Sequence, residues 1–163
     1  MVHDHRAELV VKELRTLPPS RRRDILRELQ NLEKKAFPAN EAFSFTEDLM
    51  SKQNYHVLVV QPAHAPETSV VAYAVCAGWN HRLLLHKICV SPAFRGQGIG
   101  HHLLEAVAER ARRSGCRGID LWVDESRHVA RALYAKHNFK EHDLVPEYYG
   151  PCRNGIKMVL DLK

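Results

Sequence analysis

Three stretches of the chain repeat their apolar residues at the three- and four-residue spacing of an amphipathic helix. The first is Ser20–Lys35, whose serine is suited to cap the helix N-terminus and which Pro38 brings to an end. The second, Ile99–Ser114, carries an apolar stripe along one face of a long helix, and the third covers Val129–His137. A shorter helix is expected over Phe45–Lys52.

Other stretches are β-branched and aliphatic over a few residues, which is typical of strands. These are Tyr55–Gln61, Val70–Trp79, Arg82–Val90, Ile119–Val123, Phe139–Val145 and Ile156–Leu162. Only a turn near Asn80 separates the second from the third, so we expect these two to form a hairpin. Glu8–Leu14 fits either a strand or a helix. The order β-α-α-β-β-β-α-β-α-β-β predicts a mixed α/β (α+β) fold, as one domain over residues 1–163.

Composition is that of an ordinary soluble globular protein, with 45% hydrophobic and 26% charged residues. No apolar run approaches the roughly 18 residues that span a bilayer, and residues 1–6 lack the apolar core of a signal peptide. We therefore expect a cytoplasmic protein, or a nuclear one, that does not bind membranes. The four cysteines are far apart, and no Cys/His spacing supports a metal site.

The net charge of +5 would help to attract an anionic cofactor. A nucleic acid is a less suitable partner, because the basic clusters lie on predicted helices and alternate with glutamates. Arg21–Arg23 and Lys34-Lys35, for example, are interleaved with Glu28 and Glu33. The eleven histidines, including His101-His102 on the long helix, are mostly interpreted as surface residues.

Arg95-Gly96-Gln97-Gly98-Ile99-Gly100 is the segment with the clearest candidate chemistry. It follows the apolar run Leu83–Val90 and opens the long helix, so glycine backbone and helix N–H groups would face an anion together. Neither the Walker pattern nor the dinucleotide fingerprint fits, since the glycines are spaced G-x-G-x-G. A glycine-rich turn without a ligand is the alternative.

Arg95, Gly98 and Gly100 match the pattern Arg-x-x-Gly-x-Gly, which resembles the coenzyme A loop of the GCN5-related N-acetyltransferase (GNAT) superfamily. Ala130–Phe139 is similar to the second signature of that family, an aliphatic-Tyr pair on a helix followed by an Asn-Phe turn. The resemblance covers nearly the whole chain and implies the GNAT fold, a mixed, mostly antiparallel central sheet flanked by helices.

Two further segments resemble the protein N-terminal acetyltransferases, including the ribosomal-protein type. Leu32–Pro38 is similar to their first helix and loop, and Pro146–Gly150 to their late double-tyrosine loop. The resemblance implies an enzyme that moves an acetyl group directly from acetyl-CoA to a primary amine, without a cysteine nucleophile.

The same resemblance assigns the coenzyme site. The pyrophosphate falls to Arg95, Gly96, Gln97, Gly98, Ile99 and Gly100. The backbone of Ile88, Cys89 and Val90 is expected to hold the pantetheine arm and the acetyl group. Arg127 replaces a common asparagine of the family and either pairs with a coenzyme phosphate or is solvated.

Tyr134 stands where the family usually places its general acid, and a phenol with a pKa of about 10 can protonate the leaving thiolate. His86 and Glu41 are two alternative candidates for the general base. Trp122 replaces the glutamate or histidine that relatives often carry, so the base stays open, and ordered water could relay the proton.

Phe37, Pro38, Tyr148 and Tyr149 are expected to line the acceptor side. The predicted acceptor is the α-amine of a peptide or protein N-terminus. A small amine (polyamine, amino sugar or amino acid), a lysine side chain, or coenzyme binding without turnover are the alternatives. We expect a monomer or homodimer that needs no metal.

Overall fold

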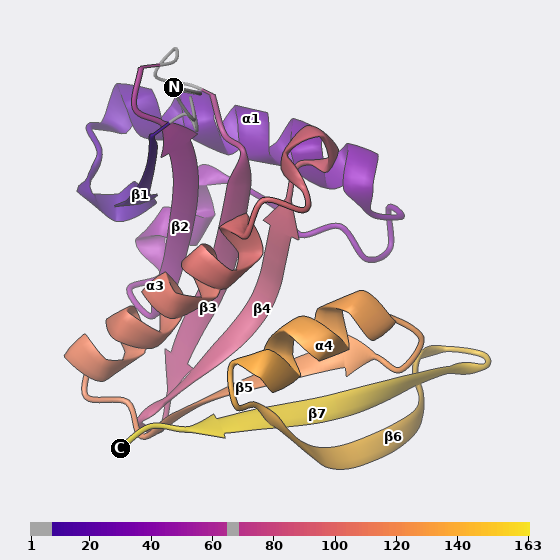
Figure 1. The fold of residues 1–163 in the computed structure, drawn as a ribbon. Helices are drawn as coiled ribbons and strands as arrows, with labels where there is room; N and C mark the ends of the chain where they lie inside the picture. The colour runs from indigo at the N-terminus through magenta and orange to yellow at the C-terminus, as the bar shows by residue number, and fades with distance from the viewer. Residues whose placement is uncertain (1–7, 65–68) are drawn as a thin grey trace, which may run out of the picture.

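The computed structural model describes residues 8–64 and 69–163, so the segment 1–6 considered above lies outside the described residues. Seven strands form one sheet in the order β1-β2-β3-β4-β5-β7-β6 (Figure 1). Neighbouring strands are antiparallel except β4 and β5, which are parallel. This confirms the predicted mixed, mostly antiparallel sheet. The strands are β1 Leu9–Glu13, β2 Tyr55–Pro62, β3 Ala72–Trp79, β4 Arg82–Val90, β5 Gly118–Asp124, β6 Lys140–Gly150 and β7 Arg153–Asp161.

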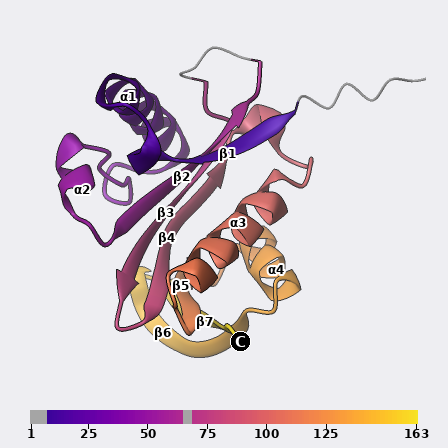
Figure 2. The same cartoon turned by 90° about the vertical axis from the view of Figure 1, so that its left-hand side faces the viewer.

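Helices cover both faces of the sheet, with α1 and α2 on one face and α3 and α4 on the other (Figure 2). Their bounds are α1 Pro19–Ala36, α2 Glu47–Ser51, α3 Ile99–Arg113 and α4 His128–Lys136. The predicted cap at Ser20 is wrong: α1 begins one residue earlier, because the fixed φ of Pro19 suits the first helical turn. Within the ranges that the structure describes, no helix is long and apolar enough to cross a membrane.

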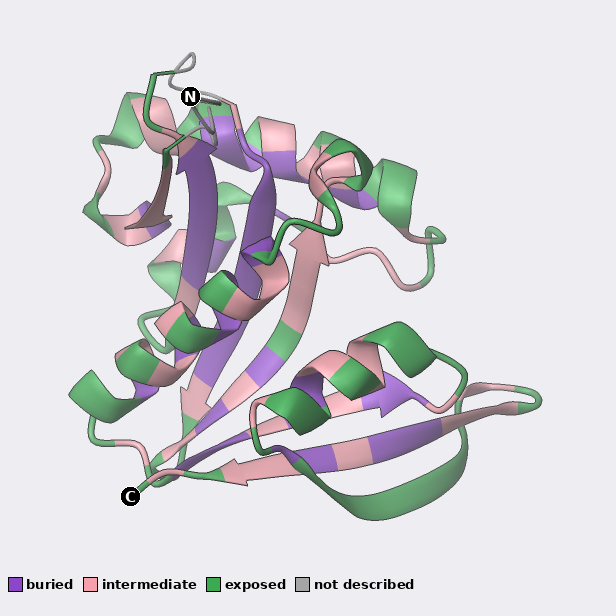
Figure 3. Ribbon diagram, in the orientation of Figure 1, coloured by how far each residue is buried: buried purple, intermediate pink, exposed green. Residues whose placement is uncertain are grey.

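Each face of the sheet buries its own apolar cluster (Figure 3). Successive side chains of a strand point to opposite faces, so Val57 and Val59 of β2 join the α1 side, while Leu58 and Val60 join the α3 side. The predicted stripe of α3 packs on the second cluster, where Leu103 is fully buried. Burial of one such leucine contributes about 1.5–3 kcal/mol.

The parallel strands β4 and β5 separate halfway along their length. Only Arg82–Leu85 pairs with Gly118–Leu121, and the remaining residues of the two strands diverge. A bulge accompanies the separation, since the pairing of β3 with β4 shifts between Val75 and Cys76 and leaves His86 without a register partner. The divergence leaves the backbone of Ile88–Val90 without a strand partner on that side.

The double-tyrosine segment differs from its predicted loop. Pro146–Gly150 belongs to β6, which pairs with β7 up to Val145, loses register, and pairs again at Gly150. The irregularity has a local cause, because Pro146 has no N–H to donate and Glu147 has a positive φ of 56°. The segment therefore arches along the sheet edge and directs its tyrosines toward β5.

Candidate active site

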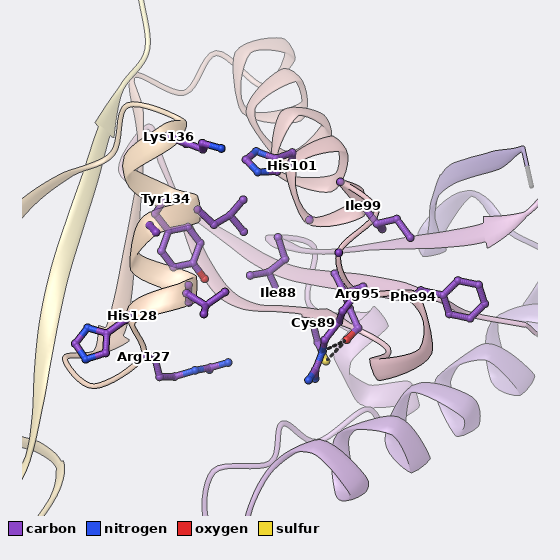
Figure 4. Close-up of a pocket in the computed structure, with 18 of the residues that line it drawn as sticks. Ile88, Cys89, Phe94, Arg95, Ile99, His101, Arg127, His128, Tyr134 and Lys136 are labelled. Carbon is purple, nitrogen blue, oxygen red and sulfur yellow. Dashed lines mark hydrogen bonds between the residues drawn. The ribbon is translucent and has the colours of Figure 1, made fainter. Parts of the chain in front are cut away.

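A cavity of about 1060 Å³ opens where β4 and β5 diverge (Figure 4). It is bounded by the end of β4, the glycine loop, the first turn of α3 and one side of α4. The predicted coenzyme residues in its lining are Ile88, Cys89, Val90, Arg95, Gly96, Gly98, Ile99, Gly100, Arg127 and Tyr134. Gln97, the remaining predicted member, is exposed and does not line the cavity.

The glycine loop has the geometry that an anion needs. Gly96 and Gly98 have φ values of 77° and 78°, in the left-handed region that favours glycine. Gly98 is the N-cap of α3 and has no side chain to bond the first N–H groups, and no acidic residue lies in the first turn of α3. These N–H groups and the positive end of the helix dipole therefore face the cavity, as in other phosphate sites. The residues present fit the pyrophosphate of coenzyme A.

Tyr134 comes from α4 and lies on the opposite wall of the cavity (Figure 4). Its ring packs against Phe139, with 5.8 Å between centroids, and only 7% of the residue is exposed. Burial raises the pKa of Tyr134 to about 12, against a smaller opposing effect of Arg127. The phenol is therefore protonated at neutral pH and able to donate a proton.

A second group of side chains lies on the face of β4 and β5 that is turned toward α1. We call it the acceptor cluster, and it comprises Phe37, Glu41, Lys87, Trp122, Tyr148, Tyr149 and Arg153. Phe37 links it to the coenzyme cavity, because the residue lines the cavity and the centre of its ring lies 3.2 Å from Lys87 Nζ. Of the predicted acceptor residues, Phe37 alone lines the cavity, whereas Pro38, Tyr148 and Tyr149 do not.

Neither candidate base lines the coenzyme cavity. The His86 ring stacks on Tyr55 with 5.6 Å between centroids, and burial lowers its pKa. The Glu41 carboxylate accepts a hydrogen bond from Arg153. The identity of the base therefore stays a prediction.

Sequence reasoning missed four charged residues of this region, namely Glu33, Lys87, Asp124 and Arg153. Lys87 donates to the Glu41 carbonyl at 2.9 Å and lies 3.7 Å from the carboxylate of the fully buried Glu33. Asp124, at the end of β5, is 6% exposed, and the Ser126 backbone N–H, together with Arg153, holds the pKa of its carboxyl below the ordinary value. Only Glu33 had a signal in the sequence, because it follows the apolar stripe of its helix and could therefore be expected to face the core.

The aromatic part of the cluster is a stack. Trp122 lies parallel to Tyr148 at 4.4 Å between centroids, and Tyr149 meets Tyr148 edge to face at 4.8 Å. The stack needs a glycine beneath it, because a Cβ at Gly155 would lie 2.7 Å from Cβ and Cγ of Tyr148. The wall that Trp122 and Tyr148 form therefore depends on a residue of β7 that does not line the coenzyme cavity.

We expect Gly155→Ala to displace Tyr148 from Trp122 and to raise the KM for the acceptor several-fold. Overpacking of this kind costs about 1–3 kcal/mol, since the nearest atoms belong to the root of the tyrosine side chain and not to its flexible end. Gly78→Ala is the matched control, because its Cβ would meet only Asn54 O at 3.9 Å. Steady-state kinetics should show the increase in KM for the first variant alone, and equal KM values would contradict this role of Gly155.

The prediction that His101 is a plain surface residue needs correction. Its Nδ1 lies 2.7 Å from Nε2 of His137, and this contact joins the first turn of α3 to the end of α4 at the cavity rim. Burial, and then the neighbouring His101, lower the pKa of His137, which Glu105 partly offsets. The contact between the two rings is therefore most favourable when His137 is neutral.

This contact predicts a loss of stability in mild acid. A histidine whose folded pKa is below the unfolded value of about 6.5 binds more protons when unfolded, so its stabilisation is present above that pH and is lost as pH falls through the folded pKa. The Tm should therefore fall between pH 7.5 and pH 5.5. His137→Gln, which keeps a hydrogen-bonding side chain without titrating, should show a smaller fall, and an equal fall in both proteins would refute the assignment.

Comparisons with known proteins agree with this arrangement. The model of the acetyltransferase (GNAT) family matches residues 23–139, so the chain belongs to that family. An uncharacterized N-acetyltransferase of Methanocaldococcus jannaschii is 38% identical over 61 residues, which make up 37% of this chain and 27% of the relative. A ribosomal protein bS18-alanine N-acetyltransferase of Haemophilus ducreyi is 27% identical over 103 residues, or 61% of this chain and 71% of the relative.

Solved structures extend the likeness in fold to almost the whole chain. The ribosomal-protein-S18-alanine N-acetyltransferase of Escherichia coli superposes with a TM-score of 0.76 at 22% identity, over 96% of this chain and 95% of that one. The predicted GNAT resemblance is thus confirmed. As a member of this family, the protein is an acetyl-CoA-dependent N-acetyltransferase.

Proposed function

We propose that the acceptor is the α-amine of a peptide or protein N-terminus. The observation that carries the proposal is the position of Phe37, which lines the coenzyme cavity and whose ring contacts Lys87 of the acceptor cluster. An amine that reaches the thioester would pass this ring. The Trp122–Tyr148 stack supplies a further aromatic surface for a side chain, and tyrosine hydroxyls can bond a peptide backbone. The relatives named for ribosomal protein bS18 support the same class of acceptor.

Each residue then has a defined task. The N–H groups at the start of α3 hold the pyrophosphate, and the backbone of Ile88–Val90 orients the pantetheine arm. The amine nitrogen attacks the thioester carbonyl, the new C–N bond forms and the C–S bond breaks. Tyr134 protonates the departing thiolate. An α-amine with a pKa near 8 is partly neutral at pH 7, so a water relay to Glu41 or His86 suffices to remove its proton.

Thiol release from acetyl-CoA, measured with a panel of acceptors, tests the proposal. The panel holds peptides with varied first residues, the same peptides with blocked N-termini, and small amines. We expect turnover only with free N-termini. Turnover confined to small amines would overturn the peptide acceptor and keep the acetyl-transfer chemistry. Turnover with blocked peptides that contain lysine would show that a side-chain amine is the acceptor.

A further inference from the structure

One guanidinium joins three separate segments of the acceptor cluster. Arg153, at the start of β7, bonds the Glu41 carboxylate through Nη1 and the Asp124 carboxylate through Nε and Nη2, each of the latter at 2.9 Å. Its central carbon lies 5.5 Å from the centre of the Tyr149 ring. Glu41 and Arg153 are 112 residues apart in the chain, so this contact is a tertiary link between distant elements.

The proposed function assigns acceptor binding to these three segments. Glu41 belongs to the loop of residues 37–46 that starts with Phe37, Asp124 ends β5, and Tyr149 belongs to the irregular end of β6. The far part of the loop has its own anchors, because the Phe43 N–H donates to Glu33 and the Phe45 N–H donates to Gln30. The near part is held by two side chains of the described residues, because Lys87 bonds the Glu41 carbonyl and Arg153 bonds the Glu41 carboxylate.

The Asp124 carboxylate is already fixed from the other side. Its Oδ1 accepts bonds from Ser126 N at 3.0 Å and from Ser126 Oγ at 2.8 Å, which leaves Oδ2 for Arg153. The carboxylate is therefore a rigid point on β5, whereas Glu41 lies on a loop. A planar, forked guanidinium that bonds both can transmit the position of β5 to the loop.

We propose that Arg153 is the positioning residue of the acceptor site, which fixes the Phe37–Glu41 segment against β5 and the double-tyrosine segment. Arg153 acts through Glu41 and Tyr149 and is not required to touch the reacting atoms. The kinetic part of this inference rests on the proposed function. Its structural part, the restraint of the loop, does not.

The kinetic test compares Arg153→Gln with Arg153→Lys. Loss of the fork should raise the KM for the acceptor about tenfold, because the aromatic and acidic groups of the loop lose their alignment, while the KM for acetyl-CoA stays within about twofold. The Arg153→Lys variant should be intermediate, since an ammonium keeps the charge but not the fork. An unchanged acceptor KM in Arg153→Gln would overturn the proposal.

Arg82 provides a matched control. It also lies between two carboxylates, Asp120 at 2.9 Å and Asp161 at 3.6 Å, but at the paired end of β4 and β5. Arg82→Gln removes a comparable ionic bridge from the same sheet and should leave the acceptor KM unchanged. An equal rise of the KM in both variants would indicate general loosening of the sheet and would contradict a positioning role for Arg153.

Hydrogen exchange tests the restraint without any turnover. In Arg153→Gln the amides of Glu41 and Ala42, which both donate to the Pro38 carbonyl, should exchange at least about tenfold faster, because local opening no longer breaks an ion pair. The amides of Phe43 and Phe45 should keep their rates. Unchanged exchange at Glu41 and Ala42 would overturn the proposal even in an active enzyme. If the parent protein acetylates no N-terminus, the proposed function fails, and this measurement still decides the role of Arg153.

Discussion

Replacement of Gly98 by valine is expected to weaken coenzyme A binding by at least about 100-fold, equivalent to about 2.7 kcal/mol. Gly98 has a φ of 78° and caps α3 directly below the expected pyrophosphate. A β-branched residue is strongly disfavoured at this φ, so the loop must change conformation and turn its N–H groups away from the phosphate. The effect does not depend on a clash inside the protein, because among the described residues no heavy atom beyond the adjoining backbone lies within 4 Å of the Cβ position.

Gly115→Val separates strain from ligand binding. Gly115 has a φ of 73°, equally open surroundings, and a position beyond the far end of α3. The two variants should lose similar amounts of stability, but only Gly98→Val should lose coenzyme affinity, as measured by isothermal titration calorimetry. Normal affinity of Gly98→Val for coenzyme A would contradict the assignment of the glycine loop as the phosphate-binding site. A comparable loss of affinity in Gly115→Val would show that global destabilisation is responsible.

Patterns local in sequence predicted most of the fold. The apolar stripe of α3 and the β-branched runs of β2, β3 and β4 specify their elements over windows of about ten residues. The turn near Asn80 was also predicted from the sequence. In the structure Asn80 and His81 both have the positive φ of a tight two-residue connection. These features depend on short-range sterics and on one buried face, which periodicity reports directly.

The separation of β4 from β5 could not be predicted from local sequence patterns. It depends on where the parallel pairing stops, after Leu85 and Leu121, and on a bulge opposite Val75 and Cys76. Beyond that point both strands mix apolar residues with polar ones, such as Lys87 and Asp124, as paired strands also do, so their composition gives no sign of the divergence. The glycine loop located the coenzyme, but the cavity beside it follows from tertiary structure.

The acceptor cluster was the least predictable part, because its ionic contacts join residues that are far apart in the sequence. Glu41 meets Arg153, and Lys87 meets Glu33, across different elements of the fold. A charged residue in a single sequence is most often solvated, so nothing local to either pair indicated which partner it would meet. Tyr148 and Tyr149 were found through resemblance alone, and their loop proved to be part of β6.

Replacement of Tyr134 by phenylalanine is expected to lower turnover by about 100-fold while coenzyme affinity stays within about twofold, a typical loss for one general acid. The ring packs against Phe139 and is almost fully buried, so phenylalanine keeps the packing and removes only the hydroxyl. Because burial raises the pKa of Tyr134 to about 12, the parent enzyme should show no loss of rate from its ionisation below about pH 10. Single-turnover rates of thiol release at saturating acetyl-CoA measure the effect.

The choice of leaving group distinguishes proton donation from a general role of the hydroxyl. Acetyl-seleno-coenzyme A releases a more acidic selenol, which needs less protonation as it departs, so the difference between Tyr134→Phe and the parent should shrink with this donor. Tyr55→Phe controls for loss of a phenol elsewhere, because Tyr55 stacks on His86 and does not line the coenzyme cavity. An unchanged rate in Tyr134→Phe would remove Tyr134 from acid catalysis, and an equal loss with both donors would assign its hydroxyl to orientation of the thioester.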